Sequence, residues 1–328
     1  MPSHTPSLSI CIATYNRADY LGETLDSIVA QLTDDVELLV VDGASTDSTP
    51  SLMKGYADGD ARIRYVRLPV KGGIDPDYDR SVELARGDYC WMFTDDDLLK
   101  EGAVTTILAA ISKGYDLVVV NAEVRDKNLR DVVEDRRIAS SSDRVFGPAE
   151  TDGLIVEALY YLSFIGGVVV RRSLWLERER RAYFGTEFVH VGVLFQKPLP
   201  NGALVIAKPY IVIRSGNAQW STRSFEIWMF KWPRLLWSFG HISDAAKCRV
   251  SAKEPWRAFA VLLRQRSLGS YTPESYRKYL QDAPAGPIWK AGARLIAGLP
   301  MPIASAIRAL YWSAKNLRRA VTTAPRAA

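Results

Sequence analysis

The chain has 328 residues, of which 48% are hydrophobic and 24% charged, and a net charge of +5. This length allows one large domain or two, and the composition argues against a disordered, collagen-like or repeat protein. The three cysteines, Cys11, Cys90 and Cys248, are far apart and lack metal-type spacing, so neither a disulfide framework nor a zinc site is expected. A reducing, cytoplasmic setting fits this pattern best.

The sequence predicts neither a secretory signal nor a membrane-spanning helix. The first 17 residues lack a charged segment followed by a long apolar stretch and a cleavage site of small residues. The longest apolar run, residues 154–170, is interrupted by Glu157 and is shorter than the roughly 20 residues that a spanning helix needs.

The first 125 residues alternate between strand-like and helix-like segments. Short apolar runs predict strands at residues 8–13, 36–41, 63–66, 89–93 and 117–120. Apolar spacing, caps and glycines predict helices at residues 21–32, from 49 onward, 77–86 and 102–112. Strands separated by helices predict an α/β fold with a mainly parallel sheet covered on both faces.

Polar segments follow three of these strands, at residues 14–17, 42–47 and 94–97. Ligands of such sheets bind outside the carboxyl ends of the strands, so we expect these three segments to form the binding site.

The third polar segment contains three consecutive carboxylates, Asp95, Asp96 and Asp97. Clustered carboxylates repel one another unless a cation offsets their charge, and Mg²⁺ or Mn²⁺ typically binds one or two carboxylates together with substrate phosphates. A solvated turn, with Asp97 capping the next helix, is the alternative for an isolated run of this kind. The position beside two other polar tips favours a metal bound with a phosphorylated ligand.

The second polar segment also has two interpretations. Asp47, Ser48 and Thr49 are explained by turn formation and helix capping alone. Asp42 follows an apolar run, so its carboxylate is expected at the rim of the sheet, where it could accept hydrogen bonds from a nucleobase. Arg17 and Lys71 could complement phosphate charge, although exposed basic residues are more often simply solvated.

Three segments together resemble the nucleotide-binding half of family 2 glycosyltransferases with the GT-A fold. They are SICIATYNRADYL (residues 9–21), ELLVVDGASTDST (37–49) and ARGDYCWMFTDDDLL (85–99). The resemblance implies a set of residues around the nucleoside of a nucleotide diphosphate-sugar: Thr14, Tyr15, Arg17 and Asp42. It also implies that Asp95 and Asp96 face the ribose and diphosphate, and that Asp97, with Asp95, binds Mn²⁺ or Mg²⁺.

Residues 164–168, Trp175 and residues 185–191 resemble the abequosyltransferase-like branch of this family, which adds deoxysugars to lipopolysaccharide O-antigen units. Many family members have a Glu-Asp pair here that includes the catalytic base, and this chain has none. Glu187 is the nearest carboxylate, and His190 could be a base, a metal ligand or an acceptor contact.

Several roles on this acceptor side remain open from the sequence. An inverting transfer needs a base, whereas a retaining one does not. Glu187 could equally be an ordinary loop carboxylate, and His190 a structural histidine. Arg214, which follows the apolar strand 210–213, could bind the diphosphate or form a structural ion pair.

The C-terminal part of the chain is basic and rich in tryptophan. Residues 215–328 contain 18 Lys and Arg against 5 Asp and Glu, or +13, while residues 1–214 contain 24 against 32, or −8. Seven of the nine tryptophans lie in the basic part: Trp220, Trp228, Trp232, Trp237, Trp256, Trp289 and Trp312. These aromatic residues could contact lipid or pack a helical subdomain, and core packing accounts for most of them.

From residue 283 onward there are seven basic residues and no acidic one. A helix beginning near Ile303 would place an apolar set on one face: Ile303, Ile307, Leu310, Tyr311, Ala314 and Leu317. It would gather three basic residues on another: Arg308, Lys315 and Arg319. Such a helix suits the surface of an anionic membrane.

The sequence therefore predicts a metal-dependent glycosyltransferase with a GT-A domain at residues 1–214 and a basic helical region at 215–328. Within the first domain, the nucleotide-sugar half is expected at about 1–125 and the acceptor half at about 126–214. The expected partners are a nucleotide diphosphate-sugar, a glycan acceptor linked to polyprenyl diphosphate, and the inner face of the cell membrane, without nucleic acid. The alternatives are a sugar-phosphate nucleotidyltransferase, a basic RNA-binding protein and a catalytically silent scaffold.

Overall fold

The computed structural model describes residues 5–217 and 223–310. These residues form two compact units. The first comprises residues 5–217 and 235–250, and the second comprises residues 223–234 and 251–310.

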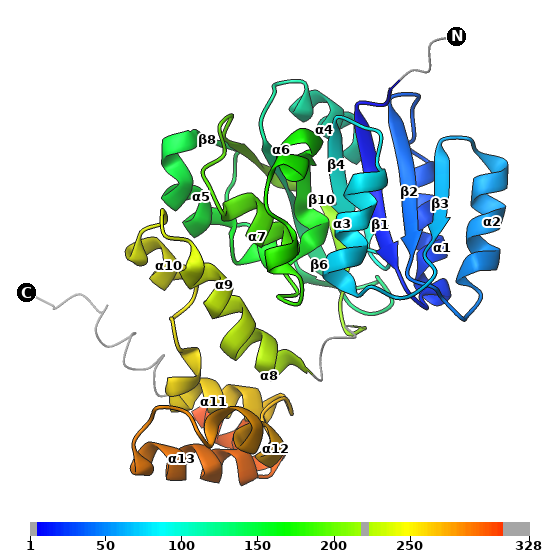
Figure 1. Ribbon diagram of the computed structural model, residues 1–328. Helices are drawn as coiled ribbons and strands as arrows, with labels where there is room; N and C mark the ends of the chain where they lie inside the picture. Colours follow the sequence, from blue (N-terminus) through cyan, green and yellow to red (C-terminus); the bar gives the residue numbers. More distant parts are fainter. Residues whose placement is uncertain (1–4, 218–222, 311–328) are drawn as a thin grey trace, which may run out of the picture. The chain divides into compact units, whose positions relative to one another are not determined.

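A single mixed sheet forms the centre of the first unit (Figure 1). Its strands are β1 (Leu8–Thr14), β2 (Val36–Asp42), β3 (Ile63–Arg67), β4 (Tyr89–Phe93), β5 (Leu98–Leu99), β6 (Leu117–Arg125), β7 (Val132–Glu134), β8 (Arg144–Phe146), β9 (Val168–Arg171) and β10 (Ala203–Arg214). The main order is β3-β2-β1-β4-β9-β6-β10-β5, with β7 beside β6 and β8 beside β10. Strands β3, β2, β1 and β4 are parallel, as are β6 and β10, which confirms the expected α/β fold.

Strand β9 was not predicted as a strand, and it is antiparallel to both of its neighbours, β4 and β6. Its first three residues are the last of the apolar run 154–170, and the rest of that run lies in the second half of α5 (Thr151–Ala158) and in a segment with two short 3₁₀ turns. A continuous apolar run does not by itself distinguish a buried strand from a buried helix.

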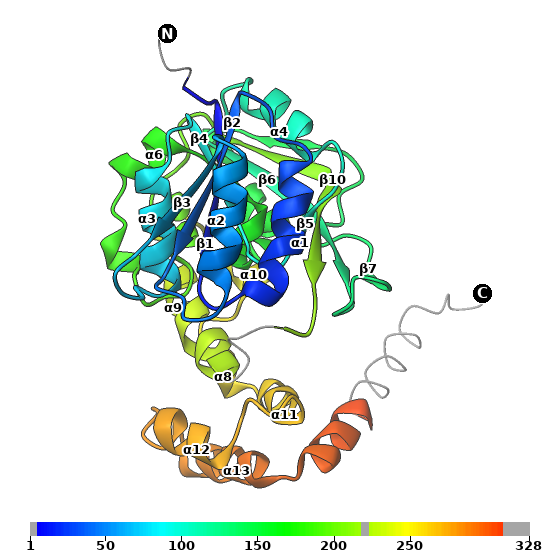
Figure 2. The same ribbon diagram turned by 90° about the vertical axis from the view of Figure 1, so that its right-hand side faces the viewer.

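Helices cover both faces of the sheet. One face carries α3 (Ile74–Leu84), α6 (Arg172–Glu177) and α7 (Val189–Phe195), and the other carries α1 (Ala18–Val29) and α4 (Ala103–Ile111) (Figures 1 and 2). Helix α2 (Thr49–Gly59) packs beside β3, and α10 (Asp244–Val250) packs on α5. Helix α3 begins at Ile74, three residues before the predicted start, which adds Asp75 to its first turn.

The second unit is helical and has its own core. It includes α8 (Ser224–Glu226), a π-helical turn (Ile227–Lys231), the start of α9 (Trp232–Ser238), α11 (Phe259–Ser267), α12 (Pro273–Ser275), α13 (Pro287–Gly298) and a last described helix, Met301–Leu310. The core combines aromatic, aliphatic and alanine side chains: Phe225, Met229, Trp256, Leu262, Tyr271, Tyr276, Leu280, Ala293 and Ala297.

The described tryptophans of the basic part of the chain are all buried or half-buried: Trp228, Trp232, Trp237, Trp256 and Trp289. Core packing therefore explains them. The other two, Trp220 and Trp312, lie outside the described residues, as do Tyr311, Ala314, Lys315, Leu317 and Arg319.

Within residues 5–217 and 223–310, no single helix has the length and apolar composition needed to cross a membrane. Helix α13 and helix 301–310 meet that criterion only as a pair, and the pair is bent by 116°.

Candidate functional site

The ends of β1 and β2 are joined by hydrogen bonds between their loops. Thr14 is opposite Asp42 in the sheet register. The Asn16 backbone N–H donates to Ser45 Oγ (2.8 Å), and the Asn16 side-chain oxygen accepts from the Thr46 N–H (2.8 Å). Asn16 has φ 54°, a left-handed conformation that asparagine tolerates better than most residues. The two polar tips therefore form one connected structure at the carboxyl edge of the sheet.

Asp42 has no exposed surface, and its carboxylate supports the second tip. One oxygen accepts the Ser45 N–H at 2.8 Å, and the other accepts the Tyr65 hydroxyl at 2.6 Å. Burial, together with the hydrogen bond to Asp42, raises the pKa of Tyr65. Arg67 Nε lies 3.7 Å from the second oxygen, so both oxygens already face donors of the protein itself.

A cation–π pair lies between the first tip and the segment before α3. The Lys71 Nζ is 3.6 Å from the centre of the Tyr15 ring. The structure therefore brings Tyr15 and Lys71, which are both predicted site residues, into contact.

The three aspartates after β4 lie against the tip of β1. The Thr14 hydroxyl donates to Asp95 Oδ2 at 2.8 Å, and Arg17 Nε donates to Asp95 Oδ1 at 3.2 Å. Arg17 also forms an ion pair with Asp96, which accepts a hydrogen bond from Asn217 Nδ2 at 2.7 Å. The structure therefore brings Thr14, Arg17 and the aspartates together, and adds Asn217 from the segment that follows β10.

Asp97 is buried and connects the tip of β4 with the end of β10. Its Oδ1 accepts the Arg214 backbone N–H at 2.8 Å, and its Oδ2 accepts the Thr94 hydroxyl at 2.5 Å. The Arg214 side chain donates from Nε to the Asp96 carbonyl (3.1 Å) and forms an ion pair with Glu23. Arg214 thus has a structural ion pair and also lies beside the acidic cluster.

The charge of this cluster is only partly compensated by the protein. Burial raises the pKa of Asp95 to about 6 and that of Asp97 to about 8, and repulsion from Asp96 adds to both shifts. A nearby cation would stabilise the ionised form of carboxyl groups whose pKa is raised in this way.

The donor set fits a hard divalent cation bound through one or two carboxylates. All candidate ligands are carboxylate oxygens, and the two hydrogen bonds to Asp97 leave a lone pair on each oxygen. No group of three or more His, Cys, Asp or Glu residues in the described part of the chain could by itself hold a metal ion. The remaining ligands would have to come from substrate or water.

The first turn of α3 packs against the strand tips. Asp77 accepts the backbone N–H groups of Gly72 and Gly73, each at 3.2 Å. A Cβ atom at Gly43, in the tip of β2, would lie 3.0 Å from Asp77 Oδ2, a tight contact that a larger residue could make only if the Asp77 side chain shifted slightly. The Tyr78 hydroxyl donates to the carbonyl of Phe93, the last residue of β4 (2.9 Å).

Asp75, in the same turn, organises the loop that contains Glu187. Its Oδ2 accepts the N–H groups of Gly185 (2.8 Å) and Glu187 (2.9 Å), and its Oδ1 accepts that of Val189 (3.0 Å). Asp75 is buried, and burial raises its pKa despite these bonds. Glu187 has φ 72°, a conformation that costs about 1–3 kcal/mol for a residue other than glycine. Asp75 therefore stabilises a strained backbone at the candidate base, a role that the sequence did not indicate.

His190 lies in α7 and is buried. Its Nε2 is 2.7 Å from the carbonyl of Leu162, and its Nδ1 has no hydrogen-bond partner among residues 5–217 and 223–310. Burial lowers the pKa of His190 to about 4. A neutral, buried ring held by a backbone carbonyl has the features of a structural histidine, which was one of the open alternatives.

Comparison with known proteins gives consistent results. Residues 9–166 match the family model described as glycosyl transferase family 2. The abequosyltransferase RfbV of Salmonella typhimurium is 32% identical over 226 residues, which cover 64% of this chain and 67% of that protein. A Campylobacter jejuni GalNAc(5)-diNAcBac-PP-undecaprenol beta-1,3-glucosyltransferase is 32% identical over 117 residues, covering 35% of this chain and 38% of that protein.

Two solved structures share the fold. The Staphylococcus aureus TarS fragment 1–349 in complex with UDP has a TM-score of 0.56 at 15% identity, covering 89% of this chain and 90% of that chain. The mannosyltransferase PcManGT of Pyrobaculum calidifontis, in complex with GDP-Man and Mn²⁺, has a TM-score of 0.51 at 17% identity, covering 95% and 81%. These likenesses confirm the expected GT-A arrangement.

Proposed function

Because the chain belongs to glycosyltransferase family 2, we propose that it transfers a sugar from a nucleoside diphosphate-sugar to a lipid-linked glycan of the O-antigen type. The observation that carries the donor part is the meeting of Thr14, Arg17 and the three aspartates at one edge of the sheet. The acceptor part is supported by the similarity to an abequosyltransferase and to a glucosyltransferase whose named substrate is linked to undecaprenyl diphosphate.

On the donor side, the tips of β1 and β2 would hold the nucleoside through the predicted contacts: Thr14, Tyr15, Arg17 and Asp42. Asp97, with Asp95, would bind a divalent cation, and Asp96 would keep Arg17 in place. A bound Mn²⁺ or Mg²⁺ would supply positive charge that stabilises the departing diphosphate. Arg17 and Arg214 lie beside the same carboxylates and can add to that charge.

On the acceptor side, we assign Glu187 as the base of an inverting transfer. The acceptor oxygen attacks the anomeric carbon, the bond from that carbon to the diphosphate breaks, and the Glu187 carboxylate takes the hydroxyl proton. Asp75 positions the Glu187 backbone through its three hydrogen bonds. His190 has a structural role in α7, where its ring is held by the Leu162 carbonyl, and takes no part in proton transfer.

The enzyme would work at the inner face of the cell membrane, where a lipid-linked acceptor is accessible from the cytoplasm. The net charge of +13 over residues 215–328 supports attraction to anionic lipid. Cytoplasmic location remains a prediction from the cysteine pattern.

The proposal is tested by incubating the protein with UDP-, GDP-, CDP- and dTDP-sugars, Mn²⁺ and a polyprenyl-diphosphate-linked glycan, then analysing products by mass spectrometry. We expect one donor class to yield a nucleoside diphosphate and a glycan extended by one sugar. Glu187→Gln should bind that donor normally but lose at least about 100-fold in kcat, because a general base contributes that much. Release of pyrophosphate would instead indicate a nucleotidyltransferase, and full activity of Glu187→Gln would exclude Glu187 as the base.

A further inference from the structure

Helix α13 is apolar on two opposite faces. Ala293 and Ala297 are buried in the core of the second unit, with Trp289 and Ile296 packed against that core. Ile288 and Leu295 lie on the other side of the helix, and their exposed fractions are 88% and 69%. Core packing therefore accounts for one face of α13 and leaves the other, apolar face unexplained.

The helix that follows α13 has the same property. Its Ala304 is buried, and its Arg308 donates to Ser267 Oγ at 3.2 Å, so this side faces the rest of the unit. Ile303, Ile307 and Leu310 lie on the opposite side at helical spacing, and all three are exposed.

Exposed aliphatic residues are concentrated in this segment. Of the 15 exposed large hydrophobic side chains in the described parts of the chain, six lie between residues 288 and 310: Ile288, Leu295, Met301, Ile303, Ile307 and Leu310. Isolated exposed aliphatic residues need no explanation, but a group of this size marks an interaction surface.

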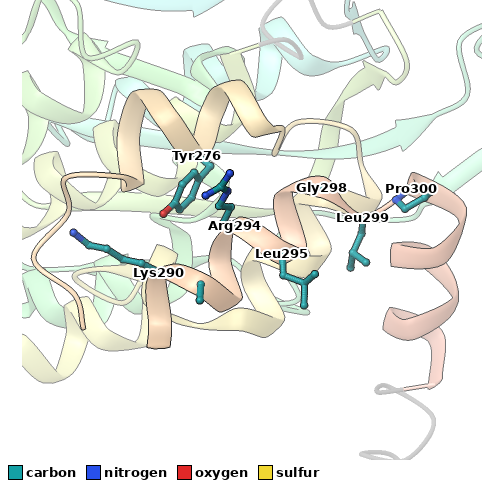
Figure 3. A pocket seen from close by; sticks show the side chains of 8 residues that line it. Tyr276, Lys290, Arg294, Leu295, Gly298, Leu299 and Pro300 are labelled. Atoms are coloured by element: carbon teal, nitrogen blue, oxygen red, sulfur yellow. The ribbon is translucent and has the colours of Figure 1, made fainter. Parts of the chain in front are cut away.

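Basic side chains flank the aliphatic ones. Lys290 and Arg294 line a groove of ≈ 580 Å³ with Tyr276, Leu295 and Leu299. Figure 3 shows Arg294 beside the Tyr276 ring, with Leu295 pointing away from them. No acidic residue occurs in the sequence after Asp282, so a second copy of this surface would meet like charges. An anionic partner is favoured over self-association.

We propose that this docking face, consisting of Ile288, Leu295, Ile303, Ile307 and Leu310 with Lys290 and Arg294, binds the surface of an anionic bilayer. The aliphatic side chains enter the boundary between headgroups and acyl chains, and the two basic side chains contact lipid phosphates. The 116° bend between the two helices suits a pair that lies on the membrane rather than one that crosses it. The proposed lipid-linked acceptor is located at the membrane, so in this respect the inference rests on the proposed function.

The test is flotation of the full chain with vesicles of equal parts phosphatidylglycerol and phosphatidylcholine, compared with pure phosphatidylcholine, without nucleotide or metal. We expect binding to the anionic vesicles that weakens with added salt. The double variant Ile288→Ser/Leu295→Ser should bind at least about tenfold more weakly, because both apolar side chains lose their burial in the interface. Lys290→Glu/Arg294→Glu should lose the preference for anionic lipid.

Val70→Ser/Val133→Ser is the matched control, because these valines are 70% and 64% exposed and lie in the first unit. It should bind vesicles like the unmodified chain. Donor binding, measured separately, should be unchanged in all three variants, which distinguishes failure of this inference from failure of the proposed function. The inference is overturned if the unmodified chain does not bind anionic vesicles, if the control loses binding equally, or if Ile288→Ser/Leu295→Ser abolishes self-association instead.

Discussion

Replacing Asp75 by asparagine tests whether the first turn of α3 positions the loop of the proposed base, Glu187. Asparagine has one acceptor oxygen, so it can keep the bonds to Gly185 and Glu187 or the bond to Val189, but it places an amide N–H₂ against the remaining N–H. Losing one hydrogen bond to a charged group costs about 1.5–3 kcal/mol, and the desolvation that raises the pKa of Asp75 offsets part of this cost. We expect a net destabilisation of about 1–3 kcal/mol.

The consequence for activity follows from the backbone of Glu187. Its φ of 72° is unfavourable by an amount similar to the lost hydrogen bond, so the loop should relax and misplace the carboxylate. Since about 1.4 kcal/mol corresponds to a factor of ten in rate, kcat should fall about 10- to 100-fold. The KM for the donor should not change, because the contacts of Asp95 and Asp97 are untouched.

The assay combines kcat and KM for the donor with the free energy of unfolding in urea. Asp79→Asn is the matched control: Asp79 lies one turn further along α3, is buried, and is bonded to Trp175 Nε1 (2.8 Å) and Arg180 Nε (3.2 Å). Both Asp79 contacts are made to Oδ1, so the asparagine oxygen can keep them and only the charge is lost; this control should destabilise the protein less and leave kcat within about threefold. When Glu187→Gln is already present, adding Asp75→Asn should lower kcat little further, because both changes disable the same step. The reasoning is refuted if Asp75→Asn keeps its kcat, or if Asp79→Asn lowers kcat as much.

Three further predictions concern ionisation and charge. Mn²⁺ affinity should increase as pH rises from 6 to 8, because Asp95 and Asp97, with pKa values raised to about 6 and about 8, must lose protons to bind the ion; calorimetry that shows no pH dependence would contradict this assignment. His190, with its pKa lowered to about 4, should contribute stability that is present above its unfolded pKa near 6.5 and is lost as pH falls toward 4. In acid denaturation, this loss in the free energy of unfolding should reach at most about 3 kcal/mol, and it should be absent in His190→Gln. If the dependence of kcat on pH between 6 and 8 changes in His190→Gln, His190 would again be a candidate base. Arg214→Lys should weaken donor binding by about tenfold, measured by calorimetry, because lysine lacks the planar fork of arginine; unchanged affinity would leave Arg214 with only its structural pair to Glu23.

The sequence predicted that the three polar tips meet at one edge of the sheet, because the signals for this are local. Each polar tip directly follows a buried apolar strand, and parallel strands bring their carboxyl ends to the same edge. Thr14, Arg17 and Asp95 are therefore assembled by the sheet register alone. The pKa values of the aspartates were not predictable because they depend on burial, and the hydrogen bond from Asn217 was not predictable because Asn217 is 121 positions from Asp96.

The acceptor side was less predictable because its contacts are distant in the sequence. Asp75 accepts hydrogen bonds from a loop more than 100 residues away in the sequence. The spacing of residues along the sequence does not indicate a contact over such a distance. Acidic residues are common in the first turn of a helix, so Asp75 and Asp77 gave no sequence signal of a buried role. The exposed face of α13 was not predicted for a different reason, since apolar residues at helical spacing do not reveal whether the face that they form is buried or exposed.

The account depends most on a divalent cation joining the carboxylates after β4 to the diphosphate of a donor. Calorimetric titration of nucleotide-sugars, with and without Mn²⁺, into the unmodified chain and Asp97→Asn tests this directly. The account predicts that one nucleotide class binds the unmodified chain at least about tenfold more tightly with Mn²⁺, and that Asp97→Asn removes most of this difference. Equal affinity with and without the ion, or an undiminished metal effect in Asp97→Asn, would contradict it.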